Sequence, residues 1–269
     1  MTADPTYRGF ALDAETALAL LQWQAELGAD EPCMDAAIDR YDLPDRAETP
    51  AAAPAAAPAP RRDEAEDHAA RAEALAAGAS TLAALAEAQE AFDAIEIRKG
   101  ARNFCFADGK AGARVMVIGE APGEEEDLQG RPFVGRAGQL LDRMFAAIGL
   151  ARDTVDAERG LYITNVLPWR PPGNRRPEPA EIAAMLPFLR RHVELAQPEM
   201  LVLMGNTPCI AALNRQGILK LRGQWSEAFG LPTLPMTHPA YLLRTPLAKR
   251  EAWGDLLSIA ARLEAGPKP

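Results

Sequence analysis

The sequence has few cysteines and no long apolar run. Its 269 residues contain three cysteines, Cys33, Cys105 and Cys209, which lie far apart and form no C-x-x-C pair. A disulfide framework and a metal site of four cysteines are therefore excluded, and we expect a cytoplasmic protein. There is no stretch of about 18 apolar residues, and the N-terminus lacks the basic start and apolar core of a signal peptide. We expect neither export nor a membrane partner.

A positive net charge is also lacking. The chain carries 29 basic and 38 acidic side chains, a formal net charge of −9. This excludes a protein that holds nucleic acid by bulk charge alone. The charge is uneven, however, because residues 1–95 carry 6 basic and 19 acidic side chains, whereas residues 96–269 carry 23 and 19. The C-terminal part can therefore bind a polyanion.

The composition divides the chain into three parts. Residues 1–41 are predicted to be a short helical segment, because apolar side chains recur at helical intervals over residues 16–27. Residues 42–62 are rich in alanine and proline, which predicts an extended linker. Residues 63–269 are predicted to form one α/β domain.

Apolar runs alternate with helical patterns in this domain. We predict strands over 114–118, 161–166, 200–204 and 231–236, and helices over 137–149, 178–196, 207–214 and 247–263. The order of strand and helix predicts a mainly parallel sheet that is covered on both faces. Ligands of such sheets bind at the carboxyl ends of the strands, and three unusual stretches each follow a predicted strand.

The first stretch, residues 119–138, holds seven glycines and prolines in twenty residues. A tight loop of this kind lets backbone amides and a carboxylate approach a ligand closely. A solvated acidic turn is the alternative. A phosphate loop is disfavoured because no Gly-Lys-Ser/Thr ending is present and the four carboxylates at 124–127 would repel phosphate.

The second stretch, residues 164–177, begins at a strand end with Asn165, whose amide offers a donor and an acceptor to a planar ring. Arg170, Arg175 and Arg176 follow on a proline-rich loop and suit phosphates. An asparagine that forms a turn and a hydrated arginine surface are the alternatives.

The third stretch, residues 237–244, places His238 directly after an apolar strand and before a proline. We expect a histidine on a loop rather than on a helix face. A structural role and a catalytic role are both open from this local pattern.

Together these stretches resemble the family 4 uracil-DNA glycosylases. The motifs are GEAPG at 119–123 with Glu126, GRPFVGRAGQLLD at 130–142, TNV at 164–166 with RPPGNR at 170–175, and HPAYLLR at 238–244. The resemblance covers roughly residues 92–265 and leaves the first 80 residues outside. It implies a three-layer α/β/α domain that flips uracil out of DNA and hydrolyses its N-glycosidic bond.

The resemblance also implies a role for each site residue. His238 would donate to the departing uracil, Asn165 would read the base edge and Phe133 would stack on its face. The catalytic residues would be Glu120, Glu126 and His238. Which of the two glutamates positions the water molecule is open. The substrate-binding residues would be Gly119, Ala121, Pro122, Gly123, Phe133 and Asn165. The DNA phosphates would be met by Arg170, Asn174, Arg175 and Arg244.

The sequence departs from the family at the four cysteines that hold a [4Fe-4S] cluster. The corresponding positions are Phe92, Ile95, Trp169 and Met185, which are all apolar. Clusters of this type need thiolates, so we expect no cofactor and a packed apolar core in its place. A degenerate relative with weak or no activity is the alternative.

Two further functions are disfavoured. Relatives that trap DNA covalently carry a histidine in an inserted basic loop, whereas residues 169–175 read WRPPGNR. A cofactor-binding α/β protein would have G-x-G-x-x-G after its first strand, where this chain reads GEAPGE. We expect a monomer whose partner is uracil-containing DNA.

Overall fold

A computed structural model describes residues 6–7, 10–11, 16–19 and 62–266. The chain divides into two compact units, residues 1–58 and 59–269. In the first unit β1 (Thr6–Tyr7) pairs antiparallel with β2 (Phe10–Ala11), and residues 16–19 are helical. The remainder of the helix predicted over 16–27 and all of the predicted linker except its last residue lie outside the described residues. The three-part division of the chain therefore stays a prediction.

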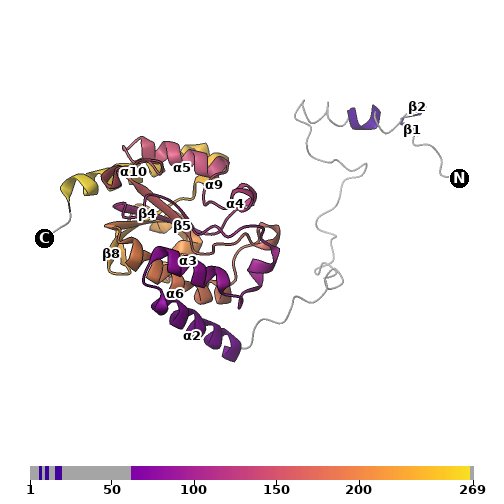
Figure 1. Cartoon of the computed structure of the whole chain (residues 1–269). Coiled ribbons are helices and arrows are strands. Elements are labelled where there is room, and N and C mark those ends of the chain that lie inside the picture. The colour runs from indigo at the N-terminus through magenta and orange to yellow at the C-terminus, as the bar shows by residue number, and fades with distance from the viewer. Residues whose placement is uncertain (1–5, 8–9, 12–15, 20–61, 267–269) are drawn as a thin grey trace, which may run out of the picture. The chain divides into compact units, whose positions relative to one another are not determined.

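The second unit is built on a six-stranded mixed sheet in the order β3-β5-β4-β6-β8-β7 (Figure 1). The four central strands, β5, β4, β6 and β8, are parallel, and β3 and β7 add antiparallel edges. The strands are β3 (Ala107–Gly109), β4 (Val115–Gly119), β5 (Leu161–Asn165), β6 (Met200–Met204), β7 (Ser226–Ala228) and β8 (Leu231–Met236). The predicted mainly parallel sheet is confirmed.

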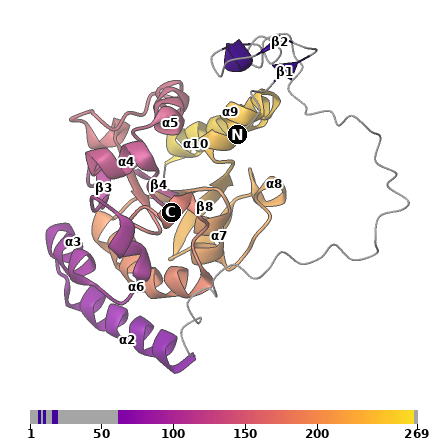
Figure 2. The ribbon, with the colours of Figure 1, turned by 90° about the vertical axis from the view of Figure 1, so that its right-hand side faces the viewer.

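Helices cover both faces of this sheet (Figures 1 and 2). One layer contains α2, α3 and α6, and the opposite layer contains α5, α9 and α10. The helices are α2 (Arg62–Gly78), α3 (Leu82–Ala91), α4 (Glu124–Gln129), α5 (Arg136–Ala146), α6 (Pro179–Ala196), α7 (Asn206–Leu213), α8 (Ile218–Leu221), α9 (Pro239–Arg244) and α10 (Lys249–Ala265). The predicted three-layer α/β/α architecture is therefore confirmed. Among the described helices, none is both long and apolar enough to span a membrane.

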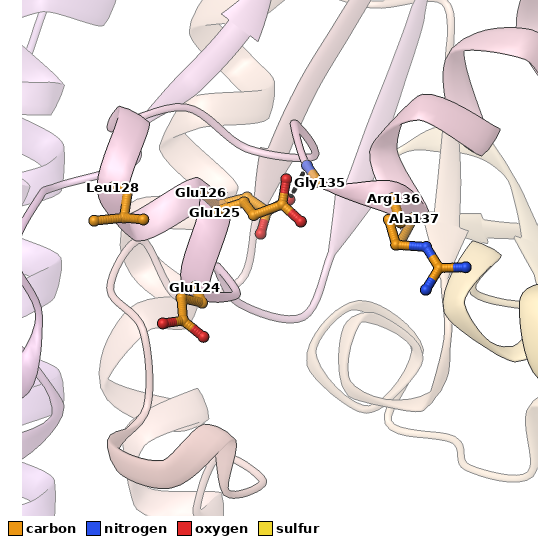
Figure 3. A pocket seen from close by; sticks show the side chains of 7 residues that line it. All are labelled: Glu124, Glu125, Glu126, Leu128, Gly135, Arg136 and Ala137. Atoms are coloured by element: carbon orange, nitrogen blue, oxygen red, sulfur yellow. Dashed lines mark hydrogen bonds between the residues drawn. The ribbon is translucent and has the colours of Figure 1, made fainter.

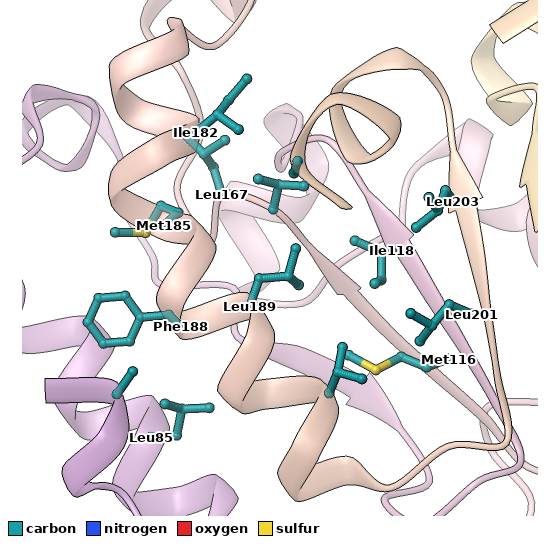
Figure 4. Packing of buried hydrophobic residues seen from close by; sticks show 14 of the residues in the cluster. Leu85, Met116, Ile118, Leu167, Ile182, Met185, Phe188, Leu189, Leu201 and Leu203 are labelled. Carbon is teal, nitrogen blue, oxygen red and sulfur yellow. The ribbon is translucent and has the colours of Figure 1, made fainter. Parts of the chain in front are cut away.

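Strand β4 shows how the sequence fills both cores. Met116 and Ile118 point to the α6 side (Figure 4), whereas Val115 and Val117 belong to the core under α5 and α10. Successive residues of a strand face opposite sides of the sheet, and helices cover both sides. All four side chains are therefore fully buried. A strand that is apolar at every position is therefore what a doubly covered sheet requires.

The four positions that correspond to cluster cysteines lie in the core on the α6 side. Phe92, Ile95, Trp169 and Met185 are 0%, 5%, 3% and 0% exposed. The Phe92 ring packs edge-on against Phe188 with 5.4 Å between centroids, and Trp169 packs against Phe104 at 5.3 Å. These side chains form part of one continuous apolar core.

The three unusual stretches all begin where a parallel strand ends. Gly119, the last residue of β4, is paired in register with Asn165, the last residue of β5. β8 ends at Met236, one strand beyond β6, and is followed by Thr237 and His238. The sheet thus brings together side chains that are far apart in the sequence.

Candidate active site

Gly119 forms the floor of the site. A Cβ atom at this position would lie 2.4 Å from Oδ1 of Asn165 and 2.5 Å from Cε2 of Phe133. Any larger residue would displace both side chains, so glycine is required for them to meet here. The structure therefore brings Asn165 and Phe133 together at the end of β4.

Asn165 carries a buried acceptor that has no partner. Its side chain is 5% exposed, and among the described residues no donor reaches its Oδ1. Buried polar atoms are nearly always paired, and leaving one unpaired is unfavourable. The described residues therefore leave this acceptor unused, and we interpret it as a hydrogen-bonding position for the N–H group of a ligand.

Phe133 and His238 form an aromatic wall next to this acceptor. The two rings are stacked with 5.4 Å between centroids and an angle of 28° between their planes. Phe133 has a left-handed backbone, with φ at +54°, which is uncommon for a bulky residue. Flat apolar rings beside an amide group suit a base that is stacked and read at its edge.

His238 lies on the loop before α9 and caps that helix, which confirms the predicted loop position. Its Nδ1 accepts a hydrogen bond from the amide of Ala240 at 3.1 Å. Burial lowers the pKa of His238 to about 4; Glu126 opposes this change, and Arg244 adds to it. The ring is therefore neutral at pH 7, and because Nδ1 is an acceptor, the proton lies on Nε2. His238 thus presents a donor without carrying a charge.

The two glutamates of the first stretch have different partners. Oε2 of Glu120 accepts a hydrogen bond from Oγ of Thr207 at 2.5 Å, and Oε1 accepts none from the described part of the chain. Both oxygens of Glu126 are occupied, since Oε1 accepts from the amides of Val134 and Gly135 at 2.9 and 2.8 Å. Its Oε2 accepts from the amide of Gly123 at 3.1 Å.

The acidic run is helical, which corrects the predicted tight loop. Gly123 is the N-cap of α4, and the four carboxylates at 124–127 occupy its first turn. Acidic side chains there are favoured by the helix dipole, which is the physical reason for the difference. Pro122 is buried and Ala121 half-buried, and both connect β4 to α4.

A shallow hollow of about 340 Å³ lies between the first turn of α4 and the start of α5 (Figure 3). It is lined by Glu124, Glu125, Glu126, Leu128, Gly135, Arg136 and Ala137. Figure 3 shows the Glu126 carboxylate beside Gly135, where α5 begins. The hollow borders the loop that carries Phe133 and contains none of the ring-binding side chains.

The predicted phosphate-binding residues lie in two groups. Arg170 donates from Nε to Oδ1 of Asn174 at 2.8 Å. Arg175 is engaged by Glu181, whose two oxygens accept at 2.9 and 2.6 Å, so its guanidinium is already paired. Arg244 is exposed at the end of α9.

Two residues of the site were not predicted from the sequence. Thr207 orients Glu120 from the first turn of α7, and its place after the parallel strand β6 is a signal that could have found it. Arg152 donates to the carbonyl oxygens of Pro132 and Phe133 at 2.9 and 2.8 Å. It lies outside all three stretches, and no sequence pattern marks it.

The residues present do not fit an iron-sulfur cluster. The four positions that correspond to the ligands supply no thiolate. Cys105 and Cys209 are buried free thiols, and burial raises the pKa of each to about 12, which keeps them protonated. Within the described ranges there is no group of three or more His, Cys, Asp or Glu that could hold a metal.

Comparison with known proteins assigns the family. Residues 106–257 match the model of the uracil DNA glycosylase superfamily. The type-4 uracil-DNA glycosylase of Thermotoga maritima is 40% identical over 53% of this chain and 72% of its own length. Those of Saccharolobus solfataricus and Archaeoglobus fulgidus are 35% and 34% identical over 62% and 61% of this chain and 79% and 84% of their own. The chain belongs to the uracil-DNA glycosylase superfamily, in its type-4 family.

Proposed function

We propose that this protein is a DNA repair glycosylase that flips uracil out of DNA and hydrolyses its N-glycosidic bond, leaving an abasic site. Its family and the names of its relatives support this proposal. The observation that carries it is the unpartnered, buried Oδ1 of Asn165 beside the stacked rings of Phe133 and His238. A flipped base needs such a combination of edge contacts and an aromatic surface.

The recognition step uses the edge of the ring. Uracil carries an N–H group between two carbonyl oxygens, and Oδ1 of Asn165 is an acceptor that lacks a donor. The Phe133 ring offers a face on which the base stacks. An analogue without the N–H group would leave the buried acceptor unpaired, which is how such sites reject wrong ligands.

The chemical step separates charge. As the bond between C1′ and N1 breaks, negative charge grows on uracil and positive charge grows on the sugar. His238 donates from Nε2 to a uracil oxygen and stabilises the leaving anion while staying neutral itself. A water molecule adds to C1′ and gives a proton to a carboxylate, and the uracil anion later takes a proton from solvent.

We assign that carboxylate to Glu120. Its Oε1 is free of protein donors in the described residues, while Thr207 holds Oε2. Both carboxylate oxygens of Glu126 accept hydrogen bonds from the amides of Gly123, Val134 and Gly135. This arrangement suits a residue that positions the backbone of the loop. The charge of Glu126 lies close enough to His238 to oppose the lowering of the pKa of that ring.

Phosphate contacts are assigned to the loop after β5 and to the end of α9. Arg170 and Asn174 are joined by a hydrogen bond and present one group, and Arg244 presents the other. Arg175 would have to leave Glu181 to meet a phosphate, so we expect it to stiffen the loop instead. These basic groups also offset the repulsion between DNA and the carboxylates of the first stretch.

We also propose that the protein folds and acts without an iron-sulfur cluster or another cofactor. The packing of Phe92, Trp169 and Met185 in the core on the α6 side supports this. Apolar side chains at native density can replace a cofactor as the centre of a small core. No step of the mechanism above needs a metal.

The oligomeric state and the compartment are also proposals. We propose a monomer that acts on DNA in the cytoplasm and has no membrane partner. The buried free thiols Cys105 and Cys209 are compatible with a reducing compartment.

The alternative is a relative that binds uracil in DNA without cutting the bond. It is not favoured, since Glu120, Asn165 and His238 are all present, at or just after the carboxyl ends of parallel strands. The test is incubation of the purified protein with a labelled oligonucleotide that contains one uracil, followed by alkaline cleavage. We expect cleavage at the uracil and none in a matched thymine oligonucleotide; no cleavage, together with tight binding, would establish the alternative.

A further inference from the structure

The position of the Phe133 ring depends on an unusual backbone conformation. Its φ of +54° lies in the left-handed region, which bulky side chains rarely adopt. This conformation directs the ring over Gly119 and against His238. A loop that relaxed to an ordinary φ would carry the ring away, so other groups must hold the backbone in place.

Arg152 holds the carbonyl side of this loop. Its Nη1 donates to the oxygen of Pro132 at 2.9 Å, and its Nη2 donates to the oxygen of Phe133 at 2.8 Å. The side chain is 9% exposed, and Asp108 and Asp142 each accept a further hydrogen bond from it at 2.8 Å. Because a guanidinium presents its donors in fixed directions, the two carboxylates also fix the donors that face the loop.

Two other residues hold the same loop from different sides. Glu126 accepts from the amides of Val134 and Gly135, directly after Phe133. Gly138, in the first turn of α5, allows the Phe133 carbonyl to come close, because a Cβ atom there would lie 1.8 Å from its oxygen. Residues 132–135 are therefore fixed through both their carbonyl and their amide groups.

We propose that Arg152 is a positioning residue for uracil recognition. Together with Glu126 it sets the backbone of residues 132–135, so that the Phe133 ring forms the stacking surface before the base arrives. Fixing a binding surface in advance reduces the ordering cost of binding. Arg152 acts through Phe133, and only the identity of the stacked base rests on the proposed function.

The test uses Arg152→Lys, which keeps the positive charge but cannot direct four hydrogen bonds from one planar group. We expect free uracil to inhibit the variant about tenfold less strongly, and kcat/KM on a uracil oligonucleotide to fall by about 10-fold to 100-fold, as for a misplaced binding group. The control is Arg143→Lys, which makes the same exchange at an exposed position of α5. It should change either value by less than about twofold, as a surface substitution does.

A double variant separates positioning from general damage to the fold. In a Phe133→Ala background the ring is already absent, so Arg152→Lys should cause no further loss of uracil inhibition. Losses that multiply in the double variant would overturn the proposal. Gly138→Ala displaces the Phe133 carbonyl without altering Arg152, and it should weaken uracil inhibition in the same way. If Arg152→Lys does not fold, this variant tests whether the position of residues 132–135 controls uracil inhibition.

Hydrogen exchange without any ligand distinguishes this proposal from the proposed function. Arg152→Lys should speed exchange of the amides of Val134 and Gly135 relative to wild type and to Arg143→Lys. A wild-type protein that excises no uracil contradicts the proposed function, and faster exchange in Arg152→Lys would then still support the positioning of Phe133. An active wild type whose Arg152→Lys variant keeps normal exchange and normal uracil inhibition would overturn the role of Arg152.

Discussion

The hydroxyl group of Thr207 donates a hydrogen bond to Oε2 of Glu120, with 2.5 Å between the two oxygen atoms. Thr207 is 6% exposed and lies in the first turn of α7, directly after β6. The bond fixes one oxygen of the carboxylate and leaves Oε1 without a donor from the described residues. A fourth parallel strand, β6, thereby contributes to a site whose other residues follow β4, β5 and β8.

We expect Thr207→Val to slow uracil excision by about 10-fold to 100-fold, the range that corresponds to losing one hydrogen bond to a charged group. Single-turnover rates on a uracil oligonucleotide measure this effect. Thr207→Ser keeps the donor and should stay near the wild-type rate. Equal rates for the valine and serine variants would show that the carboxylate is oriented by other groups.

Stability should fall in acid partly because of His192. Its Nε2 is 2.9 Å from the hydroxyl of Tyr162, and burial lowers its pKa to about 3. The unfolded chain, with an ordinary pKa of about 6.5, binds this proton more readily, so the stability that His192 contributes is complete above pH ~6.5 and is lost as the pH falls toward 3.

The size of this effect is about 1.4 kcal/mol per pH unit for each such histidine. We expect His192→Gln to reduce the dependence of the free energy of unfolding on pH between pH 6 and 5 by about this amount. Urea unfolding at both pH values measures it, with His68→Gln on α2 as the control. An unchanged dependence would contradict a buried neutral His192.

The core that replaces the cluster predicts a large effect for Trp169. Its side chain is 3% exposed and packs on Phe104, so Trp169→Ala should lower the free energy of unfolding by about 3 to 5 kcal/mol. Trp253→Ala is a matched control, because Trp253 on α10 is 44% exposed and should cost less than about 1 kcal/mol. Similar small losses in both variants would contradict a packed Trp169.

The same account expects a colourless protein that contains no stoichiometric iron and keeps its unfolding temperature after treatment with a chelator. Iron analysis and thermal unfolding measure this. About four irons per chain, with broad absorbance near 400 nm as for a cysteine-ligated cluster, would overturn the absence of the cofactor.

The sequence predicts the central sheet because its strands are mostly apolar. The bounds predicted for β6 and β8, 200–204 and 231–236, are those of the structure. The edge strands β3 and β7 were not predicted, because each has three residues, too few for a periodic pattern. Helix α4 was predicted as a loop because glycine and proline at 119–123 obscured the favourable acidic first turn.

The site could be predicted only in part, for a physical reason. Asn165 ends β5 and His238 lies two residues beyond β8, so their place at the carboxyl ends of parallel strands can be inferred from local order. Arg152 contacts the Pro132 and Phe133 carbonyls through a tertiary fold that no local pattern encodes. The left-handed backbone of Phe133 is set by the same contacts, so it cannot be predicted from the local sequence either.

The central claim is that a neutral His238 donates to uracil as charge develops, while Asn165 recognises the bound base. We expect His238→Ala to lower the single-turnover rate of excision by about 10² to 10³, as for the loss of one such donor, with little loss of affinity for uracil-containing DNA. Asn165→Ala should lower the affinity as well as the rate, because its contact is already made in the bound state.

The most direct measurement is therefore the single-turnover rate of His238→Ala beside wild type, with a separate binding titration on the same uracil oligonucleotide. The account predicts a rate lower by about 10² to 10³ and nearly unchanged binding. A variant that binds much more weakly but excises at the wild-type single-turnover rate would contradict it, because His238 would then only shape the pocket.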